Sequence, residues 1–304
     1  MRYLVTALLT CGLFVGSLQA DTAAQLAKLP VQIKEQAGED WLIDSSRYKA
    51  KAYTDSEKKE ITLSNGLVSR TFRITPNAAT VRFDNLVTGQ AMLRGVKPEA
   101  IVIIDNKRYE VGGLNGQPNY AFLTPEWLDG LTADPKAFQF SGLKLGVPNE
   151  RFGWKRVRHH APDVVWPPKG IYLRMDYAMP QEAEVLKSQK TGVVVSVHYE
   201  LYDGVPVMSK WITVQNATDK QITVDRFSSE MLALVEHNSW VGAQEGVAMI
   251  PPGYLHVETD MAFGSGNHEN ACVNTVRWRS DPQYSTQVNY RRVQPCLLSR
   301  SQNV

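Results

Sequence analysis

Apolar and polar residues alternate along much of the chain after about residue 60, which is the period-two pattern of half-buried β-strands. The clearest case is VHYELYDGVPVMSKWITVQN at residues 197–216, where two such runs flank Asp203-Gly204. Asp-Gly favours a two-residue hairpin turn because both positions tolerate positive φ. The pattern therefore predicts a hairpin whose sheet-packing residues are Val197, Tyr199, Leu201, Val207, Trp211 and Val214.

Similar strand pairs are predicted elsewhere in the chain. KKEITLSNG and LVSRTFRIT flank Asn65-Gly66, another predicted two-residue turn. Further turns are expected at Thr88-Gly89, at Asp105-Asn106 and over residues 216–219. Additional strand segments are PNAATVRFDNLVTGQ, AIVIIDNKRYEV, IYLRMDYAM and ITVDRFSSEMLALVE.

These patterns give about eight or nine strands that follow one another without helical crossovers. The predicted fold class is therefore all-β, a large antiparallel β-sandwich with few short helices. Residues 56–300 are expected to form this domain, and residues 21–55 a helical or mobile lead-in. Residues 112–170 are irregular and rich in glycine, proline and aromatic residues, which is typical of a functional loop or a packing arm.

Residues 1–20 have the pattern of a secretory signal peptide. Arg2 precedes an apolar run that ends in small residues near Ala20, which predicts cleavage before Asp21 and export to the periplasm or the cell exterior. Lipoprotein anchoring through Cys11 is the less favoured alternative, because the apolar run continues past it to Leu18. No other stretch is long and apolar enough to span a membrane.

Composition narrows the classes of partner. The 304 residues carry 33 basic and 31 acidic side chains, a net charge of +2, and 43% of them are hydrophobic. A sizeable core is expected, whereas nucleic acid is not an expected partner because its binding requires a strongly one-signed surface. After export Cys272 and Cys296 would meet an oxidising compartment, where they form either a disulfide or two buried free thiols.

Motifs for common enzyme chemistries are absent from the sequence. There is no GxSxG, P-loop, HExxH or dinucleotide fingerprint, so neither a cofactor nor a metal is expected. His256 and Glu258 are two residues apart, which on a strand places both on one face. The pair suits acid–base chemistry on a sugar hydroxyl, and the alternative is an ordinary surface pair.

The segment RFGWKRVRHHAPDVVWPPKG interleaves Trp154 and Trp166 with basic residues. An aromatic ring flanked by hydrogen-bonding groups suits a sugar, whose apolar face stacks while its hydroxyls bond. The alternative is that both rings pack the loop onto the sandwich.

Four stretches together resemble a known module. They are ITLSNGLVSRTFRITPNAATVRFDNLVTG, IDNKRYEVGGLNGQPNY, VHYELYDGVPVMSKWITVQN and VDRFSSEMLALVE. The chain resembles, over roughly residues 58–296, the N-terminal β-supersandwich of bacterial α-galactosidase-like enzymes of the glycoside hydrolase family 36 type, whose topology is galactose-mutarotase-like. The resemblance implies a carbohydrate, galactoside-like partner, and makes Trp154, Trp166 and Trp240 candidates for sugar contact.

In that family the catalytic carboxylates lie on a (β/α)₈ barrel that follows the sandwich and takes about 250 residues. This chain ends at PCLLSRSQNV, so the resemblance implies that the barrel is missing from it and that no catalytic residue is carried over. A truncated gene product and a free-standing module both remain open.

We therefore expect the non-catalytic sandwich portion of an exported α-galactosidase-like glycoside hydrolase, packing against a barrel or mediating oligomer contacts. An aldose-epimerase-like enzyme that uses His256 and Glu258, and a free-standing carbohydrate-binding module, are the alternatives.

Overall fold

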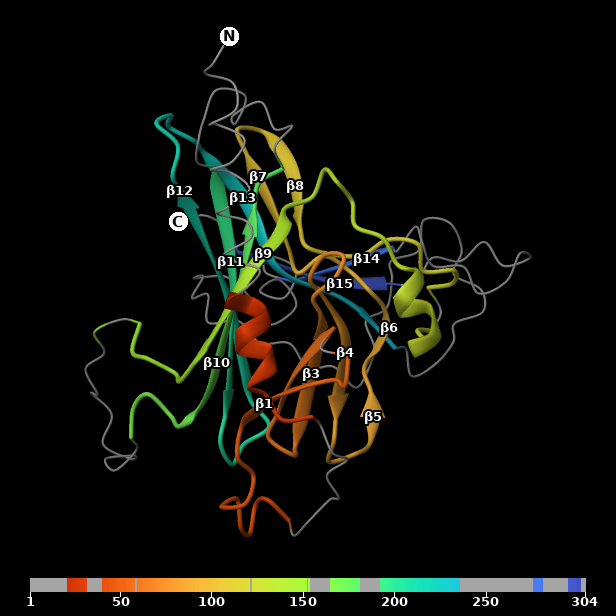
Figure 1. Cartoon of the computed structure of the whole chain (residues 1–304), viewed down its shortest axis with the longest axis vertical. Coiled ribbons are helices and arrows are strands. Elements are labelled where there is room, and N and C mark those ends of the chain that lie inside the picture. The colour runs from red at the N-terminus through yellow and green to blue at the C-terminus, as the bar shows by residue number, and fades with distance from the viewer. Residues whose placement is uncertain are drawn as a thin grey trace, which may run out of the picture.

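The computed structural model describes residues 21–31, 40–57, 59–120, 122–151, 153, 165–180, 192–235, 276–280 and 295–301, the last two ranges by their backbone alone. The chain is an all-β sandwich of antiparallel strands (Figure 1), which confirms the predicted fold class. The described helical residues are 21–27, in the lead-in, and the 3₁₀ helix η1 at Pro125–Gly130.

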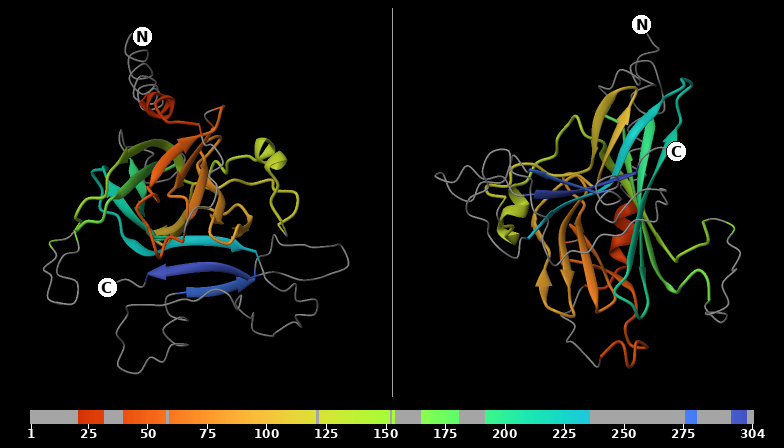
Figure 2. Two further views of the ribbon diagram at one scale, coloured as in Figure 1. Left: turned by 90° about the horizontal axis from the view of Figure 1, so that it is seen from below. Right: turned by 180° about the vertical axis from the view of Figure 1, so that it is seen from behind.

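The strands form three sheets. The first has the order β1 (Lys51–Thr54), β2 (Glu60–Ser64), β3 (Val68–Arg73), β4 (Ala79–Asn85), β5 (Gln90–Ala91). The second has the order β12 (Met208–Asn216), β11 (Val193–Tyr202), β10 (Gly170–Ala178), β9 (Gln139–Gly146). The third has the order β14 (Val276–Ser280), β15 (Pro295–Ser301), β13 (Val224–Leu234), β7 (Ala100–Ile104), β8 (Lys107–Val111), and β6 (Leu93–Gly95) also pairs with β13. Figure 2 shows the blue strands β14 and β15 lying beside the cyan β13.

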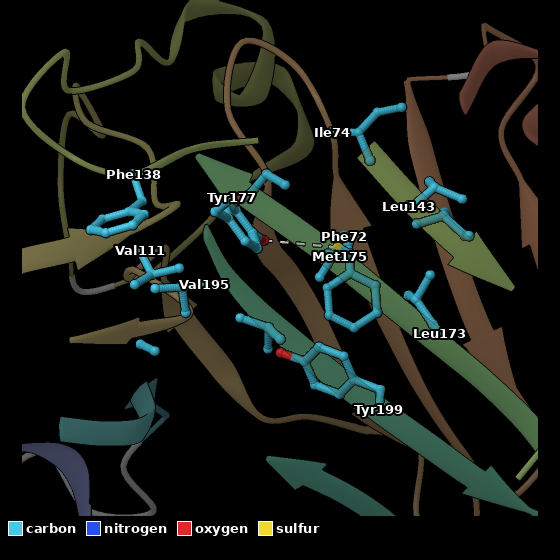
Figure 3. Packing of buried hydrophobic residues seen from close by; sticks show 14 of the residues in the cluster. Phe72, Ile74, Val111, Phe138, Leu143, Leu173, Met175, Tyr177, Val195 and Tyr199 are labelled. Atoms are coloured by element: carbon cyan, nitrogen blue, oxygen red, sulfur yellow. Dashed lines mark hydrogen bonds between the residues drawn. The ribbon is translucent and has the colours of Figure 1, made fainter. Parts of the chain in front are cut away.

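One hydrophobic core draws on all three sheets. The rings of Phe72 from β3 and Tyr199 from β11 lie 4.7 Å apart, and Leu173 and Met175 of β10 point toward them (Figure 3). Val102 and Val111 add the third sheet to the same cluster. Burial of this apolar surface is the main force that holds the sheets together.

The predicted turns are met in different ways. Asp105-Asn106 joins β7 to β8 with both residues at positive φ, 48° and 63°, as predicted. The β2–β3 turn lies one residue later than predicted: Ser64 pairs with Ser69, and Gly66, at φ 83°, takes the first central position. The β11–β12 connection is a loop over residues 203–206 and not a two-residue turn, because Leu201 pairs with Met208.

Asn65 explains why these two hairpins depart from the local prediction. Its side-chain oxygen accepts hydrogen bonds from the backbone N–H groups of Leu67, at 3.0 Å, and Val68, at 3.1 Å. Its amide nitrogen donates to the carbonyls of Tyr202, at 2.8 Å, and Val205, at 2.7 Å. One buried side chain therefore shapes its own turn and holds the neighbouring loop open.

Two further predictions need correction. Strand β9 lies in the segment that the sequence predicts to be irregular. In the hairpin of β11 and β12, Val197, Tyr199 and Leu201 are fully buried, but Val207 is exposed and Trp211 pairs with His198 on the outer face. The period of two places Trp211 on the face opposite Lys210 and Ile212.

Candidate functional site

Most residues predicted from sequence to form a site lie outside the described part of the chain. These are His256, Glu258, Trp154, Trp240 and Cys272. Cys296 lies in β15, of which only the backbone is described, so the disulfide stays a prediction. Trp166 is described, and it is half exposed at 48%.

Trp166 lines a small recess of about 110 Å³ at the end of the outer face of the second sheet. The other described lining residues are Asn149, Arg151, Pro167, Pro168, Glu200 and Tyr202. Glu200 and Tyr202 come from the end of β11, whereas the rest come from the segments between β9 and β10. In Figure 1 the green segments that leave β9 and enter β10 extend away from the sandwich beside this sheet.

The floor of the recess is held by a hydrogen-bonded chain. The Tyr202 hydroxyl donates a hydrogen bond to the Glu200 carboxylate at 2.8 Å. It also lies 2.8 Å from the Ser209 hydroxyl, and because its own proton is used on Glu200, it accepts the hydrogen bond that Ser209 donates. Glu200 is buried at 4% exposure, and burial raises the pKa of Tyr202. The described lining of the recess thus combines two aromatic rings, one carboxylate, one amide and one guanidinium.

A row of stacked rings continues from the recess across the same face. The Arg151 guanidinium lies 3.7 Å from the centre of the Trp211 ring, a cation–π contact. Trp211 in turn stacks on His198 with ring centres 4.9 Å apart and planes at 6°. Because Arg151 belongs to both the recess and the row, the stacked rings fix one wall of the recess.

His198 is a positioned, neutral imidazole. Its Nδ1 lies 2.7 Å from the Tyr172 hydroxyl and its Nε2 lies 2.9 Å from the Thr213 hydroxyl. Burial, together with Arg174 and Arg151, lowers the pKa of His198 to about 4. Both ring nitrogens of His198 are therefore engaged by neighbouring hydroxyl groups, which fix the orientation of the ring.

A second polar cluster lies inside the sandwich and joins the three sheets. Arg70 of β3 forms a two-pronged ion pair with Glu230 of β13, at 2.7 and 3.1 Å. Lys210 of β12 contacts both Glu230, at 2.7 Å, and Glu99, at 3.3 Å. The Tyr199 hydroxyl donates a hydrogen bond to Glu99. The four side-chain charges balance, two against two.

The side chains of this cluster are largely shielded from solvent. The side chains of Arg70 and Glu99 are 3% and 1% exposed, and the backbone N–H and hydroxyl of Thr80 donate to Glu99 at 2.5 and 2.7 Å. Burial disfavours ionisation, but Arg70 and Lys210 outweigh it and lower the pKa of Glu230 to about 2. Such a satisfied network supports architecture, because all its members already have partners.

The sequence offered a signal for this cluster. Arg70 is two residues from both Val68 and Phe72, so on a strand it lies on the same face as these apolar residues. Lys210 likewise lies on the same strand face as Ile212 and Val214. A charge on the inward face of a strand requires a partner inside the core.

Within the described residues, no group of three or more His, Cys, Asp or Glu side chains is arranged to hold a metal ion. None of the described helices has the length and apolar character needed to cross a membrane.

Comparisons with known proteins add no assignment: no family model matches the chain, and no curated protein is similar to it.

Proposed function

We propose that the chain is a non-catalytic, carbohydrate-binding β-sandwich of an exported α-galactosidase-like glycoside hydrolase, with its sugar contact at the Trp166 recess. The observation that carries this proposal is the half-exposed Trp166 ring beside Asn149, Arg151 and Glu200. The resemblance of the two hairpin sequences to that enzyme family supports the galactoside as the class of sugar.

The lining chemistry suits a pyranose. The Trp166 ring and the two prolines that follow it offer an apolar surface for the face of a sugar ring. Glu200 accepts hydrogen bonds from hydroxyls, Arg151 donates them, and Asn149 can do both. A recess of about 110 Å³ holds part of one sugar unit and leaves the rest in solvent.

The described site lacks the layout of a glycosidase. Hydrolysis of a glycosidic bond uses two carboxyl groups about 5–10 Å apart. Among the described lining residues of the recess, Glu200 is the one carboxylate. We therefore propose a role in binding for the described recess.

Isothermal titration of the full chain with methyl α-galactoside tests the proposal. We expect binding with a Kd on the order of 1 mM, about −4 kcal/mol, as for a shallow site. Trp166→Ala should weaken it at least about fivefold, since loss of a stacking ring costs about 1 kcal/mol or more. Phe122→Ala is the matched control, because Phe122 is an aromatic residue of similar exposure, 50%, away from the recess.

A hydrolysis assay with an aryl α-galactoside tests the non-catalytic half of the proposal. We expect no turnover above the rate without protein. Turnover by the purified chain would contradict the claim that it is non-catalytic. The claim that it binds a sugar is tested separately by the titration.

A further inference from the structure

A larger groove lies alongside the first sheet, separate from the Trp166 recess. It has a volume of about 330 Å³, within the range of small-molecule sites. One side is formed by β4 and the turn to β5, and the other by the residues that lead into η1. Figure 1 shows η1, the yellow-green helical turn, beside β4, β5 and β6.

The walls of the groove are apolar and well supported. Val81 and Leu128 are buried in one hydrophobic cluster, with Leu123 packed against it. Phe83 and Leu93 belong to an adjoining cluster. Walls that are packed from behind keep their shape, so the groove exists before any ligand binds.

Two carboxylates also line the groove, and each has one arginine as its ion-pair partner. The Asp84 carboxylate has its nearest described cation, the Arg82 Nε, at 3.9 Å. The Glu60 carboxylate lies 3.6 Å from Arg73 Nη1. Both carboxylate side chains are 20% exposed, and burial raises the pKa of each, with Asp55 adding to the effect at Glu60.

The charged residues in the described lining of the groove are Glu60, Asp84 and Arg82. Arg73 offsets Glu60, which leaves Arg82 as the described cation nearest to Asp84. Arg82 is 51% exposed, so solvent competes for its charge. A cation inside the groove would give Asp84 the close partner that it lacks among the described residues, in surroundings where charge pairing counts for more than in water.

We propose that this groove binds a small amphipathic amine, with its ammonium group at Asp84 and its short apolar body against Val81, Leu123 and Leu128. An alcohol of the same shape makes the same contacts with the apolar walls but leaves the Asp84 carboxylate without a close cation. A carboxylic acid of the same shape brings like charges together.

Three isosteric probes test this at neutral pH: hexylammonium, hexanol and hexanoate, each titrated into the full chain and followed by NMR chemical shifts. We expect hexylammonium to bind at least tenfold more tightly than hexanol, and hexanoate not to bind. Equal affinity for hexylammonium and hexanol, or no binding of hexylammonium, would overturn the proposal.

Variants place the interaction in the groove. Asp84→Asn should weaken hexylammonium at least fivefold and leave hexanol unchanged, whereas Leu123→Ser should weaken both. Glu110→Gln is the control, because this carboxylate pairs with Arg108 on β8 and does not line the groove. If Asp84→Asn does not fold, Asp84→Ser serves in its place, and unchanged affinity in the folded variant would contradict the proposal.

Discussion

At the scale of single residues, the most consequential feature is the charge cluster inside the sandwich. Arg70 and Glu99 are nearly inaccessible to solvent, and Glu230 holds both cations through short contacts. Removing one member of a buried ion pair leaves its partner charged and without compensation, which costs more than the pair itself contributes.

Glu230→Gln should therefore lower the free energy of unfolding by about 3 kcal/mol. Urea denaturation followed by tryptophan fluorescence measures the change. The exposed Glu110→Gln substitution, which breaks only a surface pair with Arg108, should change stability by less than about 1 kcal/mol. A Glu230→Gln variant as stable as wild type would show that the cluster does not hold the sheets together.

Acid should destabilise the protein over two pH ranges, which follow from the lowered pKa values of His198 and Glu230. His198 has a folded pKa of about 4 against an ordinary 6.5, so protonation favours the unfolded chain and stability falls between pH 6.5 and 4. Glu230 has a folded pKa of about 2 against 4.5, so its contribution is complete above pH 4.5 and is lost toward pH 2.

Urea denaturation at a series of pH values checks this. His198→Gln should flatten the upper range and Glu230→Gln the lower one. An unchanged pH profile in both variants would contradict the assignment of these two groups.

At the scale of elements, local signals succeeded where long-range contacts agree with them. The Asp105-Asn106 turn formed as predicted, with both residues at positive φ, and its hydrogen bonds to Thr223 and Asp225 leave that local conformation in place. The turns at residues 65–67 and 203–206 did not, because Asn65 bonds across to the second loop and the Gly204 N–H donates to the Tyr48 carbonyl at 2.7 Å. Contacts between segments more than 130 residues apart have no local signature.

Asn65→Ala should destabilise the fold by about 2 kcal/mol, because it removes the partners of two backbone donors and two carbonyls, some of them buried. Asn65→Asp keeps the acceptor but loses the donor, so it should restore protection of the Leu67 and Val68 amides without restoring the 203–206 loop. Hydrogen exchange of these amides and urea denaturation measure the two effects. Identical behaviour of both variants would rule out the double role of this side chain.

At the scale of the whole molecule, three sheets meet at one core, and each candidate binding site lies beside a different sheet. The recess lies on the second sheet, and the amine groove lies along the first.

The all-β class followed from the alternation of residues, because burial of one strand face depends only on period two. Strand β9 escaped prediction because it lies within a glycine- and proline-rich segment.

The candidate site was predicted in part. Trp166 was singled out because it lies with Trp154 in a segment that interleaves aromatic and basic residues, a pattern that suits a sugar, whereas Glu200 and Tyr202 have the pattern of ordinary strand residues. Only the pairing of β10 with β11, which brings Gly170 opposite Tyr202, places them beside Trp166. Prediction of a site that is assembled across a sheet requires the register between neighbouring strands, and the sequence pattern does not contain that register.

The central claim is that the Trp166 recess binds a sugar, and titration of methyl α-galactoside into the wild-type chain and its Trp166→Ala variant tests it most directly. The account predicts heat of binding for wild type and at least about a fivefold weaker affinity for Trp166→Ala, with Phe122→Ala unchanged. No binding by the wild-type chain, or equal affinity in the folded Trp166→Ala variant, would contradict it.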